Sequence, residues 1–300
     1  MARPKHQGPE TPTSTTVSSL LVRLRGLRPT LSPAEDRVAE KVLANAGVAA
    51  GFTITELANA AGTSETTVLR FCRRLDLPGY PALRLALAAE SAQPRHRAAP
   101  TTDISADDSI DDIIAKVAYV DASAVEETAG QLDRAALGDA AKAVASAGRV
   151  EIYGIAASFT VSSDLQQKLH RIGVHATCTA DPHIALTGVT LLGPGDVAIG
   201  ISHSGTTAET IEVLSAARSK GATTVAITNF PMSLLARQAD LTLTTAARET
   251  ALRSGATASR IAALTVVDCL YIAVAQRNLE RVEAAVTETR RSVAAHHLDG

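Results

Sequence analysis

Residues 197–219, VAIGISHSGTTAETIEVLSAARS, combine an apolar strand, a hydroxyl-rich loop and a helix, and they decide the fold class. The run Val197–Ser202 is almost continuously apolar, as in a strand that is covered on both faces. It leads into the helix Ala208–Lys220, whose free N-terminal N–H groups attract anions, while the loop glycine allows close backbone approach. The segment therefore predicts a phosphate site at a strand's carboxyl end, with candidate ligands Ser202, His203, Ser204, Gly205, Thr206 and Thr207.

The C-terminal two-thirds of the chain repeats this alternation of strand and helix. Short β-branched runs occur at Val150–Tyr153, Val174–Cys178, Val197–Ser202, Thr223–Thr228 and Leu241–Thr245. The pattern is typical of a doubly wound α/β fold with a five-stranded parallel sheet, followed here by a helical segment at Ser259–Val293. The turn Gly154–Ser158 after the first strand offers Ser158 as a further phosphate ligand. The alternative is that serines and threonines after strands merely cap helices.

Charge divides the chain into two parts with different expected partners. The 300 residues are 46% hydrophobic and 20% charged, enough for two domains, and this composition excludes a disordered or collagen-like chain. The net charge is −2, but residues 1–100 hold 13 Lys/Arg and 8 Asp/Glu, net +5, whereas residues 101–300 hold 16 and 23, net −7. Such asymmetry suggests a polyanionic partner for the basic third only. The absence of Trp and the scarcity of Phe and Tyr argue against an aromatic platform for single-stranded nucleic acid.

The basic third contains a helix-turn-helix pattern at residues 53–75, TITELANAAGTSETTVLRFCRRL. Gly62 lies where the turn between the helices requires a positive φ, and Ser64 is placed to cap the second helix. Val68, Leu69 and Cys72 are expected to form its buried stripe. A recognition helix reads bases with its first residues and phosphates with later cations, which gives the candidates Ser64, Glu65, Thr66, Thr67, Arg70, Arg73 and Arg74. The alternative is an ordinary helical hairpin with a solvated basic face.

Two stretches of the chain resemble a known family. Residues 20–90, with S-x-x-T-V-x-R-F at Ser64–Phe71 and P-G-Y-x-x-L at Pro78–Leu83, resemble the N-terminal domain of RpiR/MurR-type bacterial transcriptional regulators. Residues 133–265 resemble the sugar isomerase (SIS) domain that accompanies it. That resemblance is carried by S-x-S-G-x-T at Ser202–Thr207, the turn Gly154–Ser158 and the E-T-x-L-R-S-G…S-R-I stretch at Glu249–Ile261.

The resemblance implies a flavodoxin-like phosphosugar-binding module joined to a DNA-binding domain. It implies that the phosphate is held by Ser158, Ser202, Ser204 and Thr207, and Glu249 is a further ligand-binding candidate. Two departures from the family pattern stand out. Asp76 replaces the usual glycine after the recognition helix, and Ala156 and Ala157 replace the commoner glycine of the first turn.

Composition along the chain predicts the domain organisation and the setting. We expect a disordered tail at residues 1–16, a helix-turn-helix domain at 17–90, a Pro-rich linker at 91–105, and the SIS domain with flanking helices at 106–300. Three widely spaced cysteines provide neither a disulfide framework nor a C-x-x-C site, and no signal-like or membrane-spanning apolar run occurs, which indicates the cytoplasm. No Walker motif or clustered metal ligands are present, so no cofactor or metal is predicted.

These observations favour a transcription factor, most simply a repressor, that binds a palindromic double-stranded DNA operator and senses a phosphosugar effector. Two reading heads imply a homodimer or homotetramer. Regulation needs no turnover, so the chain is not predicted to be an enzyme. The main alternative is an aldose–ketose sugar-phosphate isomerase, with Glu249, His183 and His203 as candidate bases. A third possibility is a nucleoid-type DNA binder with a vestigial ligand domain, whose binding would depend steeply on salt.

Overall fold

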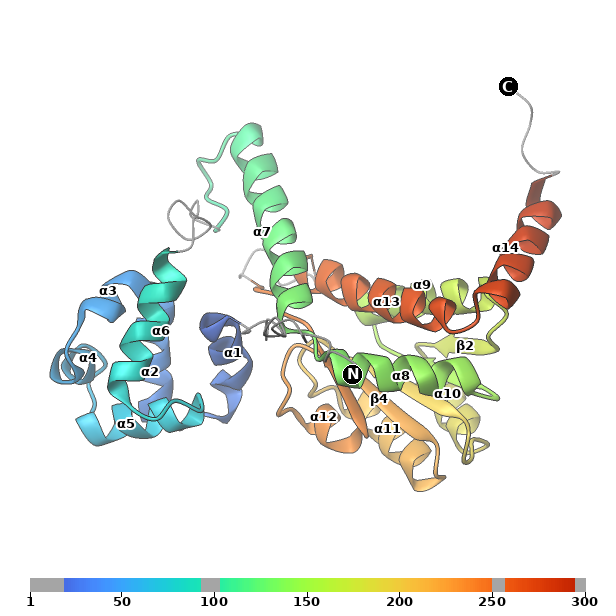
Figure 1. Ribbon diagram of the computed structural model, residues 1–300, viewed down its shortest axis with the longest axis horizontal. Helices are drawn as coiled ribbons and strands as arrows, with labels where there is room; N and C mark the ends of the chain where they lie inside the picture. The colour runs from blue at the N-terminus through green and yellow to red at the C-terminus, as the bar shows by residue number, and fades with distance from the viewer. Residues whose placement is uncertain (1–18, 93–102, 250–256, 295–300) are drawn as a thin grey trace, which may run out of the picture.

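The computed structural model describes residues 19–92, 103–249 and 257–294. A helical N-terminal part and a C-terminal part built on a sheet lie side by side, and the long helix α7 (Ile110–Gln131) stands between them (Figure 1). The tail expected at residues 1–16 and most of the linker expected at residues 91–105 lie outside the described residues.

The N-terminal part is all helical, and its helices share one apolar core. Leu24, Leu57, Phe71, Leu83 and Leu87 are fully buried in that core, so helices far apart in the sequence are packed together. The elements are α1 (Leu20–Leu27), the 3₁₀ turn η1 (Arg28–Thr30), α2 (Pro33–Ala44), α3 (Ala46–Gly51), α4 (Ile54–Ala60), α5 (Glu65–Arg74) and α6 (Tyr80–Ala92).

Local capping explains where α4 and α5 begin and end. Thr53 and Glu56 form a capping box at the start of α4, and the Ser64 hydroxyl accepts the N–H of Thr67 at the start of α5. Between the helices Gly62 holds φ at +58°, as the turn pattern predicts. At the end of α5, Asp76 holds φ at +56°, so it takes the left-handed position that glycine usually fills.

The prediction that Leu69 belongs to the buried stripe of α5 is wrong. Leu69 is 40% exposed, whereas Val68, Phe71 and Cys72 are fully buried. Positions 68, 71 and 72 share one helical face, and 69 lies a further 100° around the helix, beyond the reach of the core. The buried stripe of α5 is therefore formed by Val68, Phe71 and Cys72.

The sheet of the C-terminal part has five parallel strands in the order β2-β1-β3-β4-β5, which confirms the predicted fold class. Val150 of β1 lies opposite Val197 of β3, and β3 continues the register to Thr223 of β4. This order is the flavodoxin-like one, with its switch point between β1 and β3. The strands are β1 (Val150–Tyr153), β2 (Ala176–Thr179), β3 (Val197–Ile201), β4 (Thr223–Thr228) and β5 (Leu241–Thr244).

Helices cover both faces of the sheet, and the strand residues alternate between the two cores. Val197, Ile199 and Ile201 face the core formed with α8, α9 and α13, whereas Ala198 faces the core formed with α10, α11 and α12. Small residues on the second face let α11 approach closely; a side chain at Gly200 would lie within 3.3 Å of Leu235 and Thr210. The helices are α8 (Arg134–Ser146), α9 (Ala157–Arg171), α10 (Pro182–Val189), α11 (Ala208–Ser219), α12 (Leu234–Gln238) and α13 (Ala258–Gln276).

The C-terminal helical segment is divided in two, α13 and α14 (Leu279–Ala294). The N–H groups of Arg277 and Asn278 bond to carbonyls three residues back, which tightens and closes α13. Among the described helices, α13 alone is long and apolar enough to span a bilayer by length and composition. It packs against α7, α8 and α9 and buries Val266, Val267 and Leu270 completely, so its composition is that of a core helix.

Helix α1 contacts both parts of the molecule. Towards the recognition helix, the Arg23 guanidinium donates to the Leu75 carbonyl at 2.8 Å and to the Asp76 carboxylate at 2.9 Å. Towards the sheet part, Arg25 forms a 2.7 Å ion pair with Glu127 of α7, and both side chains are largely buried. The two parts of the molecule are therefore joined through this short helix.

Candidate phosphate cleft and DNA-reading helix

The loop that follows β3 is held in one conformation by Gly205. Its φ is +63°, and a Cβ at this position would overlap the Ser233 side chain and lie 2.9 Å from the Thr228 hydroxyl. The Gly205 N–H donates to the Ser202 carbonyl at 3.2 Å, and its carbonyl accepts the Leu235 N–H at 2.9 Å. The loop backbone is therefore fixed from both sides, and only glycine fits there.

The hydroxyls predicted as phosphate ligands lie together on this loop. Ser202 is buried, and its Oγ lies 2.9 Å from the hydroxyl of Thr207, the N-cap residue of α11. The Thr206 hydroxyl donates to Ser204 at 2.9 Å, and both of these side chains are exposed. Hydroxyls can be donors or acceptors, so these groups can exchange their mutual bonds for bonds to an anion.

Ser158 reaches the same edge of the sheet from the neighbouring strand. It lies in the first turn of α9, directly after β1, and β1 pairs with β3. Ligands of open α/β sheets bind outside the carboxyl ends of the strands at the switch point, which here lies between β1 and β3. Gly154 makes the turn possible, because a Cβ there would lie 2.8 Å from Ser162 Oγ and 2.9 Å from the Ser158 backbone.

Ala156, the N-cap residue of α9, is strained. Its φ of +53° and ψ of −121° fall in a region that glycine adopts easily and other residues rarely do. The turn thus keeps the glycine-type conformation although the sequence has alanine there, so the backbone of α9's first turn is not displaced by that departure from the family pattern.

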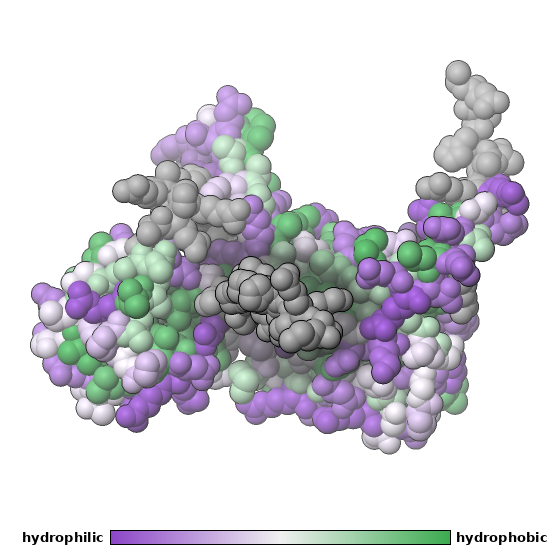
Figure 2. Space-filling view, viewed as in Figure 1, coloured by the Kyte–Doolittle hydropathy of each residue, from purple (hydrophilic) through white to green (hydrophobic). Residues whose placement is uncertain are grey.

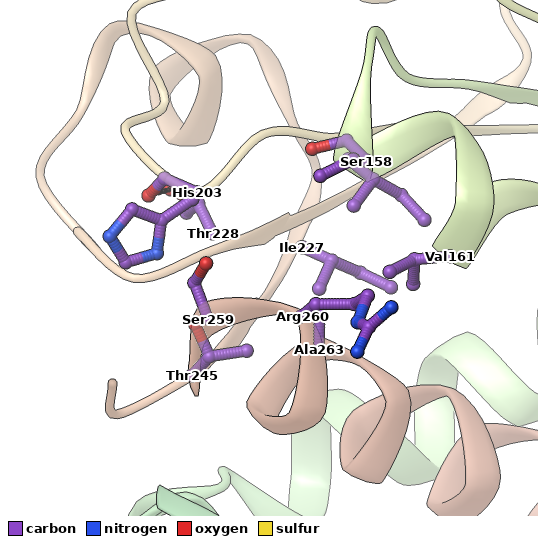
Figure 3. Close-up of a pocket in the computed structure, with 11 residues that line it drawn as sticks. Ser158, Val161, His203, Ile227, Thr228, Thr245, Ser259, Arg260 and Ala263 are labelled. Atoms are coloured by element: carbon purple, nitrogen blue, oxygen red, sulfur yellow. Dashed lines mark hydrogen bonds between the residues drawn. The ribbon is translucent and has the colours of Figure 1, made fainter. Parts of the chain in front are cut away.

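A cleft of about 340 Å³, partly open to solvent, lies beside these turns (Figure 3). Ser158 lies across it from Ser259 and Arg260, which belong to the first turn of α13. The cleft is lined by Ala157, Ser158, Val161, Ile201, His203, Ile227, Thr228, Thr245, Ser259, Arg260 and Ala263.

Of the predicted ligands, only Ser158 and His203 line this cleft; Ser202, Ser204, Gly205, Thr206, Thr207 and Glu249 do not. Sequence reasoning missed Thr228 and Thr245 at the ends of β4 and β5, and Ser259 and Arg260 of α13. Position directly after a parallel strand could have indicated the two threonines. The S-R-I stretch carries part of the family resemblance, but no local pattern places it opposite Ser158.

His203 lines the cleft, and Glu249 lies close enough for its carboxylate to interact with the His203 ring. The ring of His203 packs edge-on against Phe230 at 5.8 Å, and burial lowers the pKa of His203 although the Glu249 carboxylate opposes this. Glu249 Oε1 accepts the N–H of Ser259 at 3.0 Å and so caps α13. His203 Nδ1 and Glu249 Oε2 are buried without a hydrogen-bond partner in the structure, which leaves two polar atoms for a ligand.

His183, the third candidate base, is not part of the cleft. It is exposed in the first turn of α10, where its N–H donates to the capping carboxylate of Asp181 at 2.8 Å. Helix α10 covers the face of the sheet opposite to α9 and α13. Within the described residues, no group of three or more His, Cys, Asp or Glu side chains could hold a metal ion.

Helix α5 presents most of the predicted DNA-binding residues on one exposed surface. Ser64, Glu65, Thr66, Arg70, Arg73 and Arg74 are exposed, and Glu65 accepts a hydrogen bond from Thr55 at 2.5 Å. The structure does not place Thr67 on this exposed surface, contrary to the prediction. Thr67 is 6% exposed, and its hydroxyl lies 3.1 Å from Ser64 Oγ, because position 67 faces the core alongside Phe71.

Comparison with known proteins separates the chain into the same two modules. Residues 18–94 match the helix-turn-helix domain of the rpiR family, and residues 143–273 match the SIS domain. An uncharacterized HTH-type transcriptional regulator of Caldanaerobacter subterraneus is 37% identical over 94% of this chain and 100% of its own length. This chain belongs to the rpiR family of transcriptional regulators. The family resemblance predicted from the sequence is confirmed.

Two solved structures share the architecture. NanR of Vibrio vulnificus, complexed with ManNAc-6P, is 31% identical, with a TM-score of 0.60 over 93% of this chain and 100% of that chain. The sugar isomerase domain of an RpiR transcription factor from Sphaerobacter thermophilus is 28% identical, with a TM-score of 0.55 over 60% of this chain and 98% of that chain. This rpiR-family chain therefore combines a DNA-binding module with a SIS module.

Proposed function

We propose that this protein is a repressor whose operator affinity is set by a phosphosugar bound between the β3 loop and the first turn of α9. The observation that carries the proposal is that Ser202 directly follows β3 and Ser158 follows the neighbouring strand β1, at the switch point of a sheet that is joined to a helix-turn-helix. The ManNAc-6P complex of NanR supports a phosphosugar as the class of ligand. Ligand shifts DNA binding only as far as its affinity differs between the two states.

The phosphate of the effector would be held by neutral groups. Ser158, Ser202, Ser204 and Thr207 would contribute hydroxyls, Thr206 would contribute its backbone N–H, and Gly205 would hold the loop in the conformation that binds the phosphate. The N-terminus of α11 would contribute its dipole. His203 and Glu249 would contact the sugar with the two polar atoms that have no partner in the structure. This division suits a module with net charge −7 over residues 101–300, in which local geometry must hold the anion against the overall field.

The DNA-reading surface would be the exposed face of α5. Ser64, Glu65 and Thr66 would approach base edges at the helix N-terminus, and Arg70, Arg73 and Arg74 would bind bases or phosphates. Although burial raises the pKa of Glu35, hydrogen bonds from Ser32 and the charges of Arg70 and Arg74 lower it overall. A buried carboxylate beneath the two arginines would hold their guanidinium groups near α2 in the absence of DNA.

We propose that residues 17–90 form the DNA-binding domain, residues 91–105 the linker and residues 106–300 the sensor, and that the protein works in the cytoplasm as a dimer or tetramer. An operator with two half-sites requires two copies of α5. Helix α7 supports self-association, because Ile110, Ile114, Val117 and Val125 are exposed on one of its faces. Figure 2 shows apolar surface at the free end of this helix.

Catalysis is not needed for this function, and we propose that the SIS module binds without turnover. Glu249, the best-placed candidate base, already caps α13 through Ser259. An isomerase would interconvert an aldose phosphate and a ketose phosphate and lose that activity in Glu249→Gln. Coupled assays for this interconversion are expected to give no rate above the uncatalysed reaction, and a Glu249-dependent rate would favour the isomerase alternative.

Operator binding tests the DNA half of the proposal. Arg70→Ala should weaken operator binding by roughly 10-fold or more, because a lost base or phosphate contact costs about 1–3 kcal/mol, and should leave phosphosugar binding unchanged. Arg84→Ala is the matched control, since Arg84 donates to the Ala50 carbonyl on α3. Gel shifts across a salt series measure both variants. Equal DNA affinity of Arg70→Ala and wild type would remove Arg70 from the reading face.

Ligand titration tests the sensor half. Ser204→Ala should weaken phosphosugar binding roughly 10-fold, because a hydrogen bond to a charged group contributes about 1.5–3 kcal/mol, and should leave DNA affinity without ligand intact. Ser219→Ala, at the other end of α11, is the control; its hydroxyl donates to the Ala216 carbonyl. Calorimetry with a panel of sugar phosphates gives the affinities. If no member of the panel binds or alters operator affinity, the proposed sensor role is wrong.

A further inference from the structure

The wall of the cleft that α13 forms carries the positive charge of Arg260, which is not part of the proposed phosphate-binding loop. Arg260 lies in the first turn of α13, lines the cleft, and is exposed. Of the described residues that line the cleft, it alone carries a permanent positive charge. Its guanidinium forms no hydrogen bond or ion pair with the described residues, so its five donors are available to a ligand.

The position of Arg260 is unfavourable unless an anion lies nearby. The N-terminus of a helix is its positive end, where a cation is repelled, and the first turn of α13 contains no acidic residue. The carboxylate of Glu249 is at this helix end, but it accepts the N–H of Ser259 instead of pairing with Arg260. A guanidinium and a helix dipole therefore act together on the same wall.

A hydroxyl beside Arg260 points in the same direction. Ser259 is 5% exposed as a whole residue, it lines the cleft, and its hydroxyl forms no hydrogen bond with another described residue. The other two hydroxyls on this side are occupied, since Thr228 donates to the His203 carbonyl and Thr245 donates to Asn229. The Ser259 hydroxyl can therefore donate a hydrogen bond to a ligand in the cleft. Figure 3 places Ser259 beside Arg260 and across from Ser158.

We propose that the effector is a phosphorylated sugar acid, whose carboxylate is bound by Arg260 and Ser259 while its phosphate is bound by the β3 loop. This inference rests on the proposed sensor function. A carboxylate matches one guanidinium in geometry and in charge. A second phosphate would bring an additional negative charge close to Glu249 and leave it uncompensated. The carbon chain of the sugar would span the cleft between the two walls, which is partly open to solvent.

The test compares two open-chain ligands that differ only at carbon 1. The full chain is titrated by calorimetry with a hexitol 6-phosphate and with the aldonate 6-phosphate of the same configuration. We expect the aldonate to bind about 10–100-fold more tightly, as for a charged hydrogen-bonded pair. Arg260→Met should lose that preference while keeping the affinity for the hexitol phosphate, which is neutral at carbon 1, within about twofold. Arg260→Lys should keep part of the preference, because it keeps the charge and loses the planar fork.

Controls separate failure of this inference from failure of the proposed function. Arg171→Met removes an exposed arginine at the far end of α9 and should change neither affinity. Equal binding of both ligands to the wild type overturns the sugar-acid assignment but leaves the phosphosugar sensor intact. Equal weakening of both ligands by Arg260→Met also overturns it, because Arg260 would then contact the phosphate. Absence of binding by either ligand overturns this inference and counts against the sensor as well.

Discussion

At the scale of single residues, Asp76 and Ala156 are the described non-glycine residues with positive φ angles, and each lies where a helix meets a functional segment. Asp76 ends the recognition helix, and Ala156 begins the helix that carries Ser158. Aspartate tolerates the left-handed region because its short side chain can bond locally, whereas alanine has no such compensation. The two positions should therefore respond differently to glycine.

Ala156→Gly should stabilise the protein. Relief of an unfavourable φ/ψ pair is worth about 1–3 kcal/mol and outweighs the added freedom of glycine in the unfolded chain, so we expect a net gain of about 1 kcal/mol. Urea denaturation followed by circular dichroism measures the free energy of unfolding. Ala157→Gly is the matched control, because Ala157 has helical geometry and its replacement should cost about 0.5–1 kcal/mol. A loss of stability in Ala156→Gly would contradict the assignment of strain.

His203 should make stability depend on pH. Burial lowers the pKa of His203 in the folded protein, whereas an unfolded histidine takes up its proton near pH 6.5. Below that pH the unfolded state binds more protons, so stability is full above about pH 6.5 and falls as the pH drops towards the folded pKa. Unfolding free energies at pH 7.5 and 5.5 should differ less in His203→Gln than in wild type. The exposed His175→Gln should retain the wild-type difference.

At the scale of elements, strand positions and helix starts could be predicted because their causes are local. All five strands were visible as short β-branched runs, and Ser64 and Gly62 marked the turn before α5. The burial of Thr67 and the exposure of Leu69 could not be predicted, because they depend on which side of α5 contacts α2, α4 and α6. The division of the C-terminal helical segment at Arg277 could not be predicted either, because no proline or glycine marks this helix end.

The candidate site could also be predicted only in part. Its hydroxyl loop was predictable because Ser202, Ser204 and Thr207 follow one strand directly. Thr228 and Thr245 could have been inferred from the ends of two other strands, but Arg260 could not, because only the packing of α13 brings it to the opposite wall. Sequence spacing can describe one side of a cleft, whereas the distance across it is a tertiary property.

The end of α5 should depend on Asp76. Its backbone completes a C-terminal motif in which the Leu77 N–H bonds to the Cys72 carbonyl at 3.0 Å, and its carboxylate pairs with Arg23. Asp76→Gly should change stability by less than about 1 kcal/mol, because backbone relief offsets loss of an exposed ion pair. Asp76→Val should cost about 1–2 kcal/mol, because a β-branched residue resists positive φ. Thermal denaturation of both variants provides the comparison, and similar melting temperatures would contradict this account.

At the scale of the whole molecule, α1 offers a physical connection between the DNA-reading helix and the sensor. Arg23 holds the end of α5, and two residues later Arg25 pairs with Glu127. Burial lowers the pKa of Arg25 while Glu127 opposes the shift, as expected for a desolvated pair. The same helix packs Gly26 against Pro231, where a Cβ would lie 3.3 Å from the proline ring. A displacement of this end of the sheet would therefore move α1.

Glu127→Gln should reduce the effect of ligand on operator affinity more than it reduces either operator affinity or phosphosugar affinity. Removing one partner of a largely buried pair leaves the Arg25 charge uncompensated, so α1 should detach from the sensor. We expect operator affinity without ligand and phosphosugar affinity without DNA each to change less than about threefold, while the effect of ligand on operator affinity falls by 1–3 kcal/mol, the usual size of allosteric coupling. An unchanged ligand effect in gel shifts would show that coupling runs elsewhere. Glu126→Gln, the neighbouring residue, is the control.

The double attachment of α1 also decides how sensors of this kind can be exchanged between proteins. The obvious place to join two relatives is between residues 92 and 103, where the described helical and sheet parts separate. In such a chimera, Arg25 and Gly26 of one protein would contact the residues that correspond to Glu127 and Pro231 in the other protein. A transplanted sensor should report its ligand to foreign DNA only when residues 20–27 are chosen to match the donor of the sheet, although they precede the recognition helix in the chain.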